Sequence, residues 1–227
     1  MSRIDRYQEN IGNKFDRQGN VRYFPGNTVI SFIQHDSPAF GLVREIRGIL
    51  QESEAGDCFC YLPDDSIHMT VIQGVCDQHR KAQLWTKLLP LNAPLEQVDK
   101  LFEERFAQVQ PLGNVRMRTA GLKADETYGI YLQPETDLDA QRLLRYRDDV
   151  SAKLGVRFPD HDSYRYHISI CYGVRTPTAE QNRTLDKFEK SINARLEAQP
   201  STFDIAEPNL TYFRSMFRFE KERFDRP

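Results

Sequence analysis

Two stretches of the sequence decide how the chain folds: Ile67-His68-Met69-Thr70-Val71-Ile72-Gln73-Gly74-Val75 and Tyr166-His167-Ile168-Ser169-Ile170-Cys171-Tyr172-Gly173-Val174. They align without a gap at a constant offset of 99 residues, the distance from His68 to His167, and the histidine, the hydroxyl residue, the glycine and the last valine coincide. A constant offset between like residues is typical of an internal duplication. We therefore expect a single domain made of two related lobes.

The same offset relates further predicted elements of the two halves. It carries residues 28–33 onto 127–132, two β-branched and aromatic runs that predict strands. It also carries Asp77 onto Thr176, two residues of the type that caps the first turn of a helix. A further helix in each half is predicted by apolar residues at helical spacing, namely Leu42, Ile46, Ile49 and Leu50 in the first half, and Leu143, Tyr146, Val150 and Leu154 in the second.

These elements give the predicted organisation of the chain. Each half consists of a strand, a helix, a motif strand, a second helix and a further strand, at about 115–122 in the first half and 209–213 in the second. A short extra strand is expected at 58–62. The predicted bounds are an N-terminal arm over 1–27, a first repeat over about 28–122, a second repeat over about 127–215 and a C-terminal tail to residue 227.

The polar residues of the two motifs are expected to share one face of their strands. Side chains alternate along a strand, so His68 and Thr70 point away from the face that buries Met69, and His167 and Ser169 do the same in the second motif. If the halves face each other across a pseudo-two-fold axis, both pairs line one shared cleft.

A histidine followed two residues later by a hydroxyl residue is a weak signal in itself. The pattern also occurs at 35–37 and at 161–163, so four of the five histidines match it. Those two copies contain Asp36 and Asp162 and belong to turn-like segments, whereas the motif copies alternate with apolar residues. Only His68 and His167 share the 99-residue offset, which favours these two as functional residues.

Two histidines and two hydroxyl groups suit chemistry on a phosphodiester. Imidazoles with an ordinary pKa near ~6.5 can divide into one neutral base and one protonated acid at about neutral pH. Hydroxyl groups can donate hydrogen bonds to the non-bridging oxygens of the phosphate.

The composition excludes several classes of protein. The chain has 227 residues, of which 39% are hydrophobic and 28% charged, so collagen-like, disordered and coiled-coil classes are excluded. The formal net charge is -2, which gives the whole molecule no field that would hold a long polyanion, although a local anion site remains compatible with it.

The sequence also predicts where the protein works. It has no run of the roughly 20 apolar residues that a membrane helix needs, and the segment 1–6 lacks the apolar core of a secretory signal. The four cysteines, Cys58, Cys60, Cys76 and Cys171, are too scattered for a disulfide framework. We expect a cytoplasmic protein with reduced thiols, no membrane association and no obligate protein partner, and a monomer by default.

The two motifs resemble the paired His-x-Thr/Ser signatures of the 2H phosphoesterase superfamily, which includes the 2′-5′ RNA ligase-like proteins and the cyclic nucleotide phosphodiesterases. The segment 14–28 looks like that of an uncharacterised bacterial or fungal branch. The resemblance implies an α+β, bilobal, duplicated fold in which two antiparallel-rich sheets face a central cleft and the helices lie outside.

The resemblance also implies a mechanism and its residues. It implies a hydrolase that needs no metal and no cofactor, with His68 and His167 as general base and acid and with Thr70 and Ser169 holding the phosphate. The implied reaction opens a cyclic phosphodiester, of the 2′,3′-cyclic nucleotide or RNA-end type, or cleaves a 2′,5′ or 3′,5′ linkage.

Two other hypotheses remain open at this stage. The first is a nucleotide- or RNA-binding module that keeps the cleft without turnover. The second is a metallohydrolase whose ligands are His161, Asp162, His167 and Cys171. Accessory roles in the cleft are considered for the cations Arg116, Arg118 and Arg165, and for the rings of Tyr131 and Tyr172.

Overall fold

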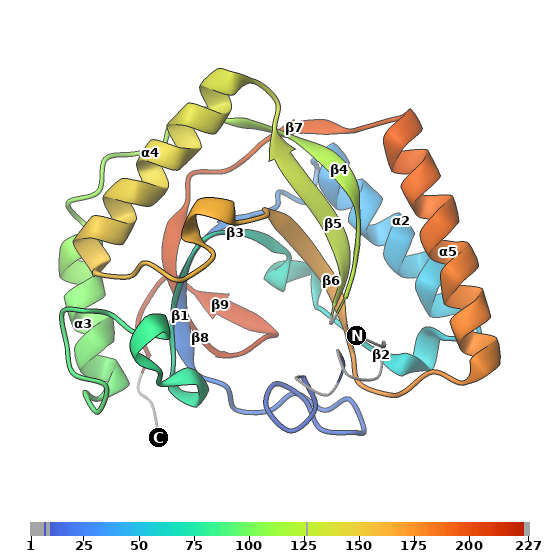
Figure 1. Cartoon of the computed structure of the whole chain (residues 1–227), viewed down its shortest axis with the longest axis horizontal. Helices are drawn as coiled ribbons and strands as arrows, with labels where there is room; N and C mark the ends of the chain where they lie inside the picture. The colour runs from blue at the N-terminus through green and yellow to red at the C-terminus, as the bar shows by residue number, and fades with distance from the viewer. Residues whose placement is uncertain (1–6, 8–9, 126, 225–227) are drawn as a thin grey trace.

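A curved antiparallel sheet carries both motif strands and is flanked by helices (Figure 1). The computed structural model describes residues 7, 10–125 and 127–224. Within them the strands are β1 Gly26–Phe32, β2 Phe59–Tyr61, β3 His68–Cys76, β4 Arg116–Ala124, β5 Thr127–Pro134, β6 His167–Gly173, β7 Thr202–Asp204, β8 Asn209–Ser215 and β9 Arg218–Glu220. They form one sheet in the order β7-β4-β5-β6-β3-β1-β8-β9, and β2 pairs with β6 beside this path.

The α-helices lie in two pairs on opposite sides of the sheet (Figure 1). They are α2 Pro38–Glu52, α3 Leu95–Phe106, α4 Asp137–Leu154 and α5 Ala179–Ala198. α3 lies beside α4, and α2 lies beside α5, where Glu45 and Arg195 form an ion pair between the two helices. The α+β class, the antiparallel strands and the outer helices predicted from the sequence are thereby confirmed.

The two motif strands meet at one point in the middle of the sheet. β3 pairs with β6 through a single pair of residues, Met69 and Ile168. Farther along, the same edge of β6 pairs with β2, from Tyr61 opposite Cys171 to Phe59 opposite Gly173. Along this edge β3 begins where β2 ends and continues past His167, the first residue of β6, so the motif strands share only a narrow junction, at which the two expected sheets join into one.

The strand order is the same on both sides of this junction. Outward from it run β3, β1 and β8 on one side and β6, β5 and β4 on the other. β1 corresponds to β5, and β3 to β6, under the 99-residue offset. Strand order alone does not establish a rotation that relates the two halves, so the pseudo-two-fold axis and the bounds of the repeats stay predictions. Residues 1–6, 8–9 and 225–227 of the expected arm and tail lie outside the described residues.

The glycines of the motifs are required by close packing. A Cβ atom on Gly74 would lie 2.3 Å from the backbone oxygen of Asn27, and one on Gly173 would lie 2.4 Å from the ring of Tyr7. Both contacts are too short for any side chain, which explains why glycine occurs at the same position of the two motifs.

The helix after each motif starts later than the sequence suggests. Asp77 opens only a short 3₁₀ turn, Asp77–His79, and its carboxylate is bonded to Arg80, while α3 begins at Leu95. In the second half the N-cap of α5 is Thr178, which forms a capping box with Gln181. The predictions of Asp77 and Thr176 as N-caps were therefore wrong.

No helix within the described parts of the chain combines the length and the apolar character needed to cross a bilayer.

Candidate active site

The four motif residues predicted from the sequence line a single cavity. His68 and Thr70 on β3 and His167 and Ser169 on β6 are among its lining residues, and its volume is about 420 Å³. The intervening residue of each motif is fully buried in the core. The predicted alternation of faces is thus confirmed for both strands.

The junction between the motif strands sets the relative position of the four side chains. In an antiparallel register through Met69 and Ile168, His68 lies next to Ser169, and Thr70 lies next to His167 on the facing strand. All four belong to the face opposite the buried pair. Each histidine is therefore brought beside the hydroxyl residue of the other motif.

Both imidazoles are held by the same kind of contact. Nδ1 of His68 lies 2.6 Å from the backbone oxygen of Ser66, and Nδ1 of His167 lies 3.0 Å from that of Arg165. In each case the partner is two residues upstream, so the 99-residue offset extends to this hydrogen bond. A carbonyl oxygen only accepts, so Nδ1 carries the proton in both rings and Nε2 is left for a substrate.

Burial lowers the pKa values of both imidazoles, and the charges around the two rings differ. Burial lowers the pKa of His68 to about 4, against the opposing effect of the Ser66 carbonyl and with a smaller contribution from His167. The His68 ring lies edge-on to Phe219, with 4.4 Å between the ring centroids.

Burial also lowers the pKa of His167, and the Arg165 carbonyl opposes this effect. The charges around this ring act in both directions: Lys123 and Lys14 lower the pKa, whereas Asp125 raises it. The rings of Tyr131 and Tyr164 lie 6.4 Å and 6.3 Å from the imidazole. A carboxylate that favours the protonated form therefore acts on His167, and none is among the causes that shift the pKa of His68.

The rest of the cavity wall is largely aromatic and apolar. The described residues that line it include one lysine, Lys14, and no aspartate or glutamate. The aromatic and sulfur-containing members are Phe24, Cys76, Phe158, Tyr164, Tyr172, Phe213, Met216 and Phe219. Such a wall suits an anion that carries a flat, apolar group.

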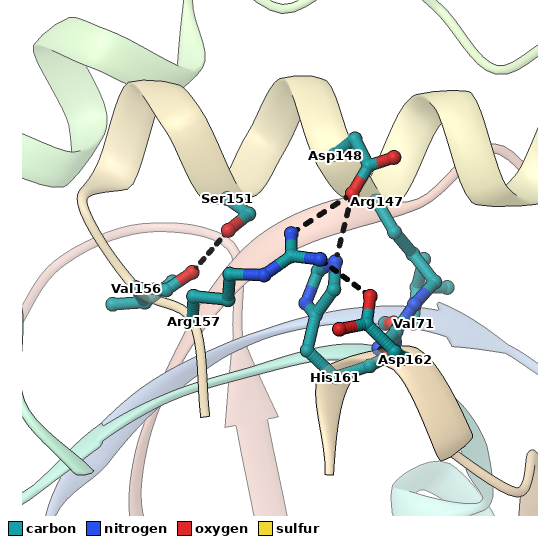
Figure 2. Close-up of polar contacts among 8 residues, drawn as sticks. All are labelled: Val71, Arg147, Asp148, Ser151, Val156, Arg157, His161 and Asp162. Atoms are coloured by element: carbon teal, nitrogen blue, oxygen red, sulfur yellow. Dashed lines mark hydrogen bonds and ion pairs between the residues drawn. The ribbon is translucent and has the colours of Figure 1, made fainter. Parts of the chain in front are cut away.

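A buried arginine contacts the first motif strand, β3, and the segment that precedes the second, β6 (Figure 2). Arg147 of α4 is 3% exposed and donates hydrogen bonds to the backbone oxygens of Val71 on β3 and of His161. Its guanidinium lies 4.7 Å from the ring centroid of Tyr164, and Tyr164 lines the cavity together with Thr70. No aspartate or glutamate pairs with Arg147 in the part of the chain that the structure describes.

His161 belongs to a surface network beside this arginine. Its Nε2 lies 3.0 Å from Asp148, and Arg157 bridges Asp148 and Asp162 (Figure 2). Arg157 and His161 hold the pKa of Asp148 below its ordinary value. His161 thus serves the packing of the turn His161–Ser163 against α4.

The ligand set of the metallohydrolase hypothesis is not assembled. His161 is bonded to Asp148, His167 lines the cavity, and Cys171 is fully buried. Burial also raises the pKa of the Cys171 thiol, which disfavours the thiolate that a metal would need. No group of three or more histidine, cysteine, aspartate or glutamate residues close enough for a metal ion occurs among the described residues.

The accessory residues considered from the sequence have mixed outcomes. Tyr172 lines the cavity, whereas Tyr131 does not. Arg165, Arg116 and Arg118 do not line the cavity. Arg165 lies over the ring of Tyr131, 3.8 Å from its centroid, and Arg116 pairs with Glu135 and Asp204.

Sequence reasoning missed Lys14, His79, Arg147 and Tyr164. The signal for Tyr164 was present, since aromatic residues at 164 and 166 directly precede the second motif. Arg147 gave no such signal, because arginine on an amphipathic helix is usually exposed.

A family model and several solved structures match this chain. The family model, described as "2H-phosphodiest: Domain of unknown function (DUF1868)", matches residues 14–128, about half of the chain. The matched segment contains the first motif and ends before the second. A search of curated proteins found no significant match.

Three solved structures are similar. The conserved protein of unknown function ATU0111 from Agrobacterium tumefaciens str. C58 has a TM-score of 0.84 at 25% identity and covers 93% of this chain and 90% of that chain. TT0787 of Thermus thermophilus has a TM-score of 0.44 at 12% identity, covering 82% and 87%. E. coli LigT complexed with phosphate has a TM-score of 0.42 at 10% identity, covering 84% and 87%. Only the first score supports a shared fold.

Proposed function

This chain belongs to the 2H-phosphodiesterase family described as a domain of unknown function (DUF1868), and from this premise we propose that it is a metal-independent phosphodiesterase. It opens a cyclic phosphodiester, of the 2′,3′-cyclic nucleotide or RNA-end type, or cleaves a 2′,5′ or 3′,5′ linkage. The single observation that carries the proposal is that His68, Thr70, His167 and Ser169 line one cavity.

The phosphate of the substrate is held between the motif strands. The hydroxyls of Thr70 and Ser169 donate hydrogen bonds to its two non-bridging oxygens. The absence of a carboxylate from the described lining residues keeps repulsion of the anion low. The rings of the wall pack against the group that the phosphate carries.

The imidazoles transfer the protons through their Nε2 atoms. We assign His68 as the base, because burial lowers its pKa to about 4 and no carboxylate is among the causes that favour its protonated form. Its neutral Nε2 takes the proton of a water molecule as the water oxygen attacks phosphorus. His167, where Asp125 and the Arg165 carbonyl oppose the lowering of the pKa by burial and by the two lysines, gives a proton from Nε2 to the leaving ribose oxygen as the P–O bond breaks. The product is a phosphomonoester with a free ribose hydroxyl, and the two histidines have exchanged their protonation states.

The direct test is hydrolysis of nucleoside 2′,3′-cyclic phosphates, with the product identified by mass. We expect addition of one water molecule and formation of a phosphomonoester, at the same rate with and without EDTA. Substrates that bind without any product would favour the alternative of a binding module. Loss of activity on chelation, with recovery on adding a metal, would contradict the metal-independent mechanism.

The lowered pKa values of the two imidazoles predict an acidic optimum for kcat/KM. The base must be neutral, so activity rises as pH increases through the pKa of His68 at about 4. The acid must be protonated, so activity falls as pH increases through the pKa of His167, which lies below its ordinary value near ~6.5. We expect a bell between these limits and a loss of at least about tenfold by pH 8.

A bound phosphodiester anion stabilises the protonated imidazoles, so the optimum of kcat is expected at a higher pH than that of kcat/KM. Both profiles are obtained from initial rates over a pH range that extends from below the pKa of His68 to well above the ordinary pKa of histidine. A flat kcat/KM profile up to pH 8 would contradict these pKa directions.

The natural substrate is proposed to be a small nucleotide or an RNA end, acted on by a monomer in the cytoplasm. All four cysteines occur as free thiols, consistent with a reducing compartment.

A further inference from the structure

A ring from the C-terminal hairpin, formed by β8 and β9, packs directly on the imidazole of the first motif. Phe219 lies on β9, which pairs with β8 at the end of the sheet order. Its ring centroid lies 4.4 Å from that of His68, with 60° between the two planes, and both residues line the cavity. A segment beyond the predicted bounds of both repeats therefore forms part of the site around His68.

The place of Phe219 is fixed by a row of phenyl rings. Phe213 is its cross-strand neighbour on β8, with 5.3 Å between the ring centroids. Phe24 stacks on Phe213 at 6.4 Å, and its N–H donates to the backbone oxygen of Arg214 at 2.7 Å. Aromatic pairs at these separations are stabilised beyond the area that they bury. The Phe219 ring is thus held in place by packing on β8 and, through Phe213, on the segment before β1.

The His68 ring is restrained by two contacts of different kinds. Its Nδ1 donates a hydrogen bond to the Ser66 oxygen at 2.6 Å, and Phe219 packs on the ring. Rotation of an imidazole about the bond that carries it is otherwise soft, with a broad and roughly two-fold profile. A phenyl ring packed on the imidazole restricts this rotation, so the proton stays on Nδ1 and Nε2 stays open to the substrate.

The second motif has the same hydrogen bond without the same packing. Nδ1 of His167 lies 3.0 Å from a backbone oxygen two residues upstream. The rings beside it, those of Tyr131 and Tyr164, have their centroids 6.4 Å and 6.3 Å from the imidazole. The 99-residue offset therefore relates the two hydrogen bonds but not the two aromatic surroundings. The closer ring belongs to the histidine proposed as the base.

An aromatic ring beside a histidine can act on its charge in two opposite ways. The face of the ring attracts a cation, which favours the protonated imidazole. The body of the ring excludes water, which favours the neutral imidazole. Burial is the largest influence on His68 and lowers its pKa to about 4, so the exclusion of water outweighs the attraction at this site.

The charged groups of the surrounding elements do not account for this effect. His167 on β6 lowers the pKa of His68 in the same direction as burial, by a smaller amount. The charged side chains of β9 and of the turn before β3 are paired, namely Arg218 with Glu220 at 2.8 Å, Asp64 with Arg44 at 2.7 Å and Asp65 with His35 at 3.6 Å. Neither they nor Lys14 and His79 of the cavity lining are among the causes that shift the pKa of His68.

We propose that Phe219 is a positioning residue for the base of the reaction: its ring holds the His68 imidazole against the Ser66 carbonyl and keeps water away from it, so that Nε2 meets the substrate as an unprotonated acceptor. This inference rests on the proposed function and assigns part of it to the C-terminal hairpin. The two histidines thus acquire different roles through packing, although their motifs and their hydrogen bonds match.

The test is a nuclear magnetic resonance titration of the imidazoles, which requires no turnover. The His68 signals are assigned by their loss in His68→Ala. In Phe219→Ala we expect the pKa of His68 to rise by about one unit toward its ordinary value, because water reaches the ring. The nitrogen shifts are expected to change from those of one tautomer, with the proton on Nδ1, to those of a mixture of both.

Three further variants test the cause of this shift. Phe219→Leu keeps an apolar side chain over the ring and is expected to move the pKa of His68 by less than about half a unit. Phe217→Ala is the matched control, because Phe217 belongs to the same hairpin but packs on Phe15 at 6.0 Å and does not line the cavity. The pKa of His68 should not change in this variant. Should Phe219→Ala fail to fold, Phe219→Gln keeps the length of the side chain and brings a hydrated amide to the ring, with the same expected rise.

The same shift is expected in the rates. In Phe219→Ala the acidic limb of the kcat/KM profile moves up by about one pH unit, which lowers kcat/KM about threefold near pH 4.5. The alkaline limb, set by His167, is expected to stay in place. A merely structural defect would instead lower kcat/KM by the same factor at every pH.

The outcomes separate the positioning role from the proposed hydrolysis. An unchanged or lowered pKa of His68 in Phe219→Ala, or an unchanged tautomer, would overturn the positioning role and leave the hydrolase intact, as would an equal rise of this pKa in Phe217→Ala. If no phosphodiester is turned over while the pKa and the tautomer shift as expected, the hydrolase proposal fails and the effect of Phe219 on the His68 imidazole stands.

Discussion

Alanine at either His68 or His167 lowers kcat for a nucleoside 2′,3′-cyclic phosphate by about 10²–10⁴-fold, as expected for loss of a general base or acid. The fold is expected to survive, because both rings lie on the cavity face of their strands and their backbone contacts remain. Product binding measured by calorimetry should stay within a few-fold, since Thr70 and Ser169 keep their hydroxyls.

A substrate with a better leaving group distinguishes the two histidines. A nucleoside 3′-(p-nitrophenyl phosphate) expels a stable phenolate, which needs no proton from the enzyme. His167→Ala is therefore expected to hydrolyse this ester nearly as fast as the unmodified protein, whereas His68→Ala remains impaired. The reverse pattern would exchange the two roles, and equal impairment of both variants on both substrates would contradict the assignment of one acid.

His35→Ala is the matched control for both variants. His35 also begins a His-x-Ser sequence, but it is exposed and lies near Asp65, and it does not line the cavity. Its replacement is expected to leave kcat unchanged. A large loss in this variant would mean that the sequence pattern, and not the cavity, identifies the functional histidines.

Arg147→Met is expected to lower both stability and turnover. The change leaves the backbone oxygens of Val71 and His161 without their donor, which costs about 1–3 kcal/mol for each buried group. Removal of a buried charge offsets part of this cost, so we expect a net loss of about 2 kcal/mol, or about 4–8 °C in Tm. kcat should fall about tenfold, because Tyr164 in the cavity wall loses the cation beneath its ring and Val71, the neighbour of Thr70 on β3, loses the donor to its backbone oxygen.

Two comparisons separate these effects. Arg157→Met removes an exposed guanidinium from the neighbouring network (Figure 2) and is expected to change stability by less than about 1 kcal/mol with kcat unchanged. Arg147→Lys keeps the charge but places one nitrogen on a shorter side chain where two guanidinium nitrogens donate, so it should recover part of kcat. kcat is measured at a temperature at which Arg147→Met and Arg147→Lys are both folded. An unchanged kcat in Arg147→Met under these conditions would limit Arg147 to a structural role.

The local pattern of the sequence predicts many of the strands and the four motif residues of the candidate site. The offset between His68 and His167 is a property of the chain alone, and strand periodicity then places Thr70 and Ser169 on the same face as the histidines. The strands predicted at 58–62, 115–122 and 209–213 are confirmed as β2, β4 and β8.

Features that depend on contacts distant in sequence could not be predicted in this way. Pairing of β2 with β6 joins segments far apart along the chain, and nothing in the Phe59–Tyr61 segment identifies its partner. Lys14 reaches the cavity because Phe15 is buried against Tyr172. The start of α3 at Leu95, well after the cap predicted at Asp77, could not be predicted because the chain between them forms short 3₁₀ turns, Asp77–His79 and Ala82–Leu84, that local residue types do not distinguish from the first turn of a helix.

The narrow junction between β3 and β6 links the evolution of the core to that of the site. Met69 and Ile168 are fully buried, and each stands between the histidine and the hydroxyl residue of its motif. A change in the size of either side chain alters the separation of the strands and with it the distance between the two imidazoles. A substitution of similar size that would be neutral elsewhere in a core affects activity here and is subject to selection. Met69 and Ile168 should therefore vary least among the buried residues of related chains.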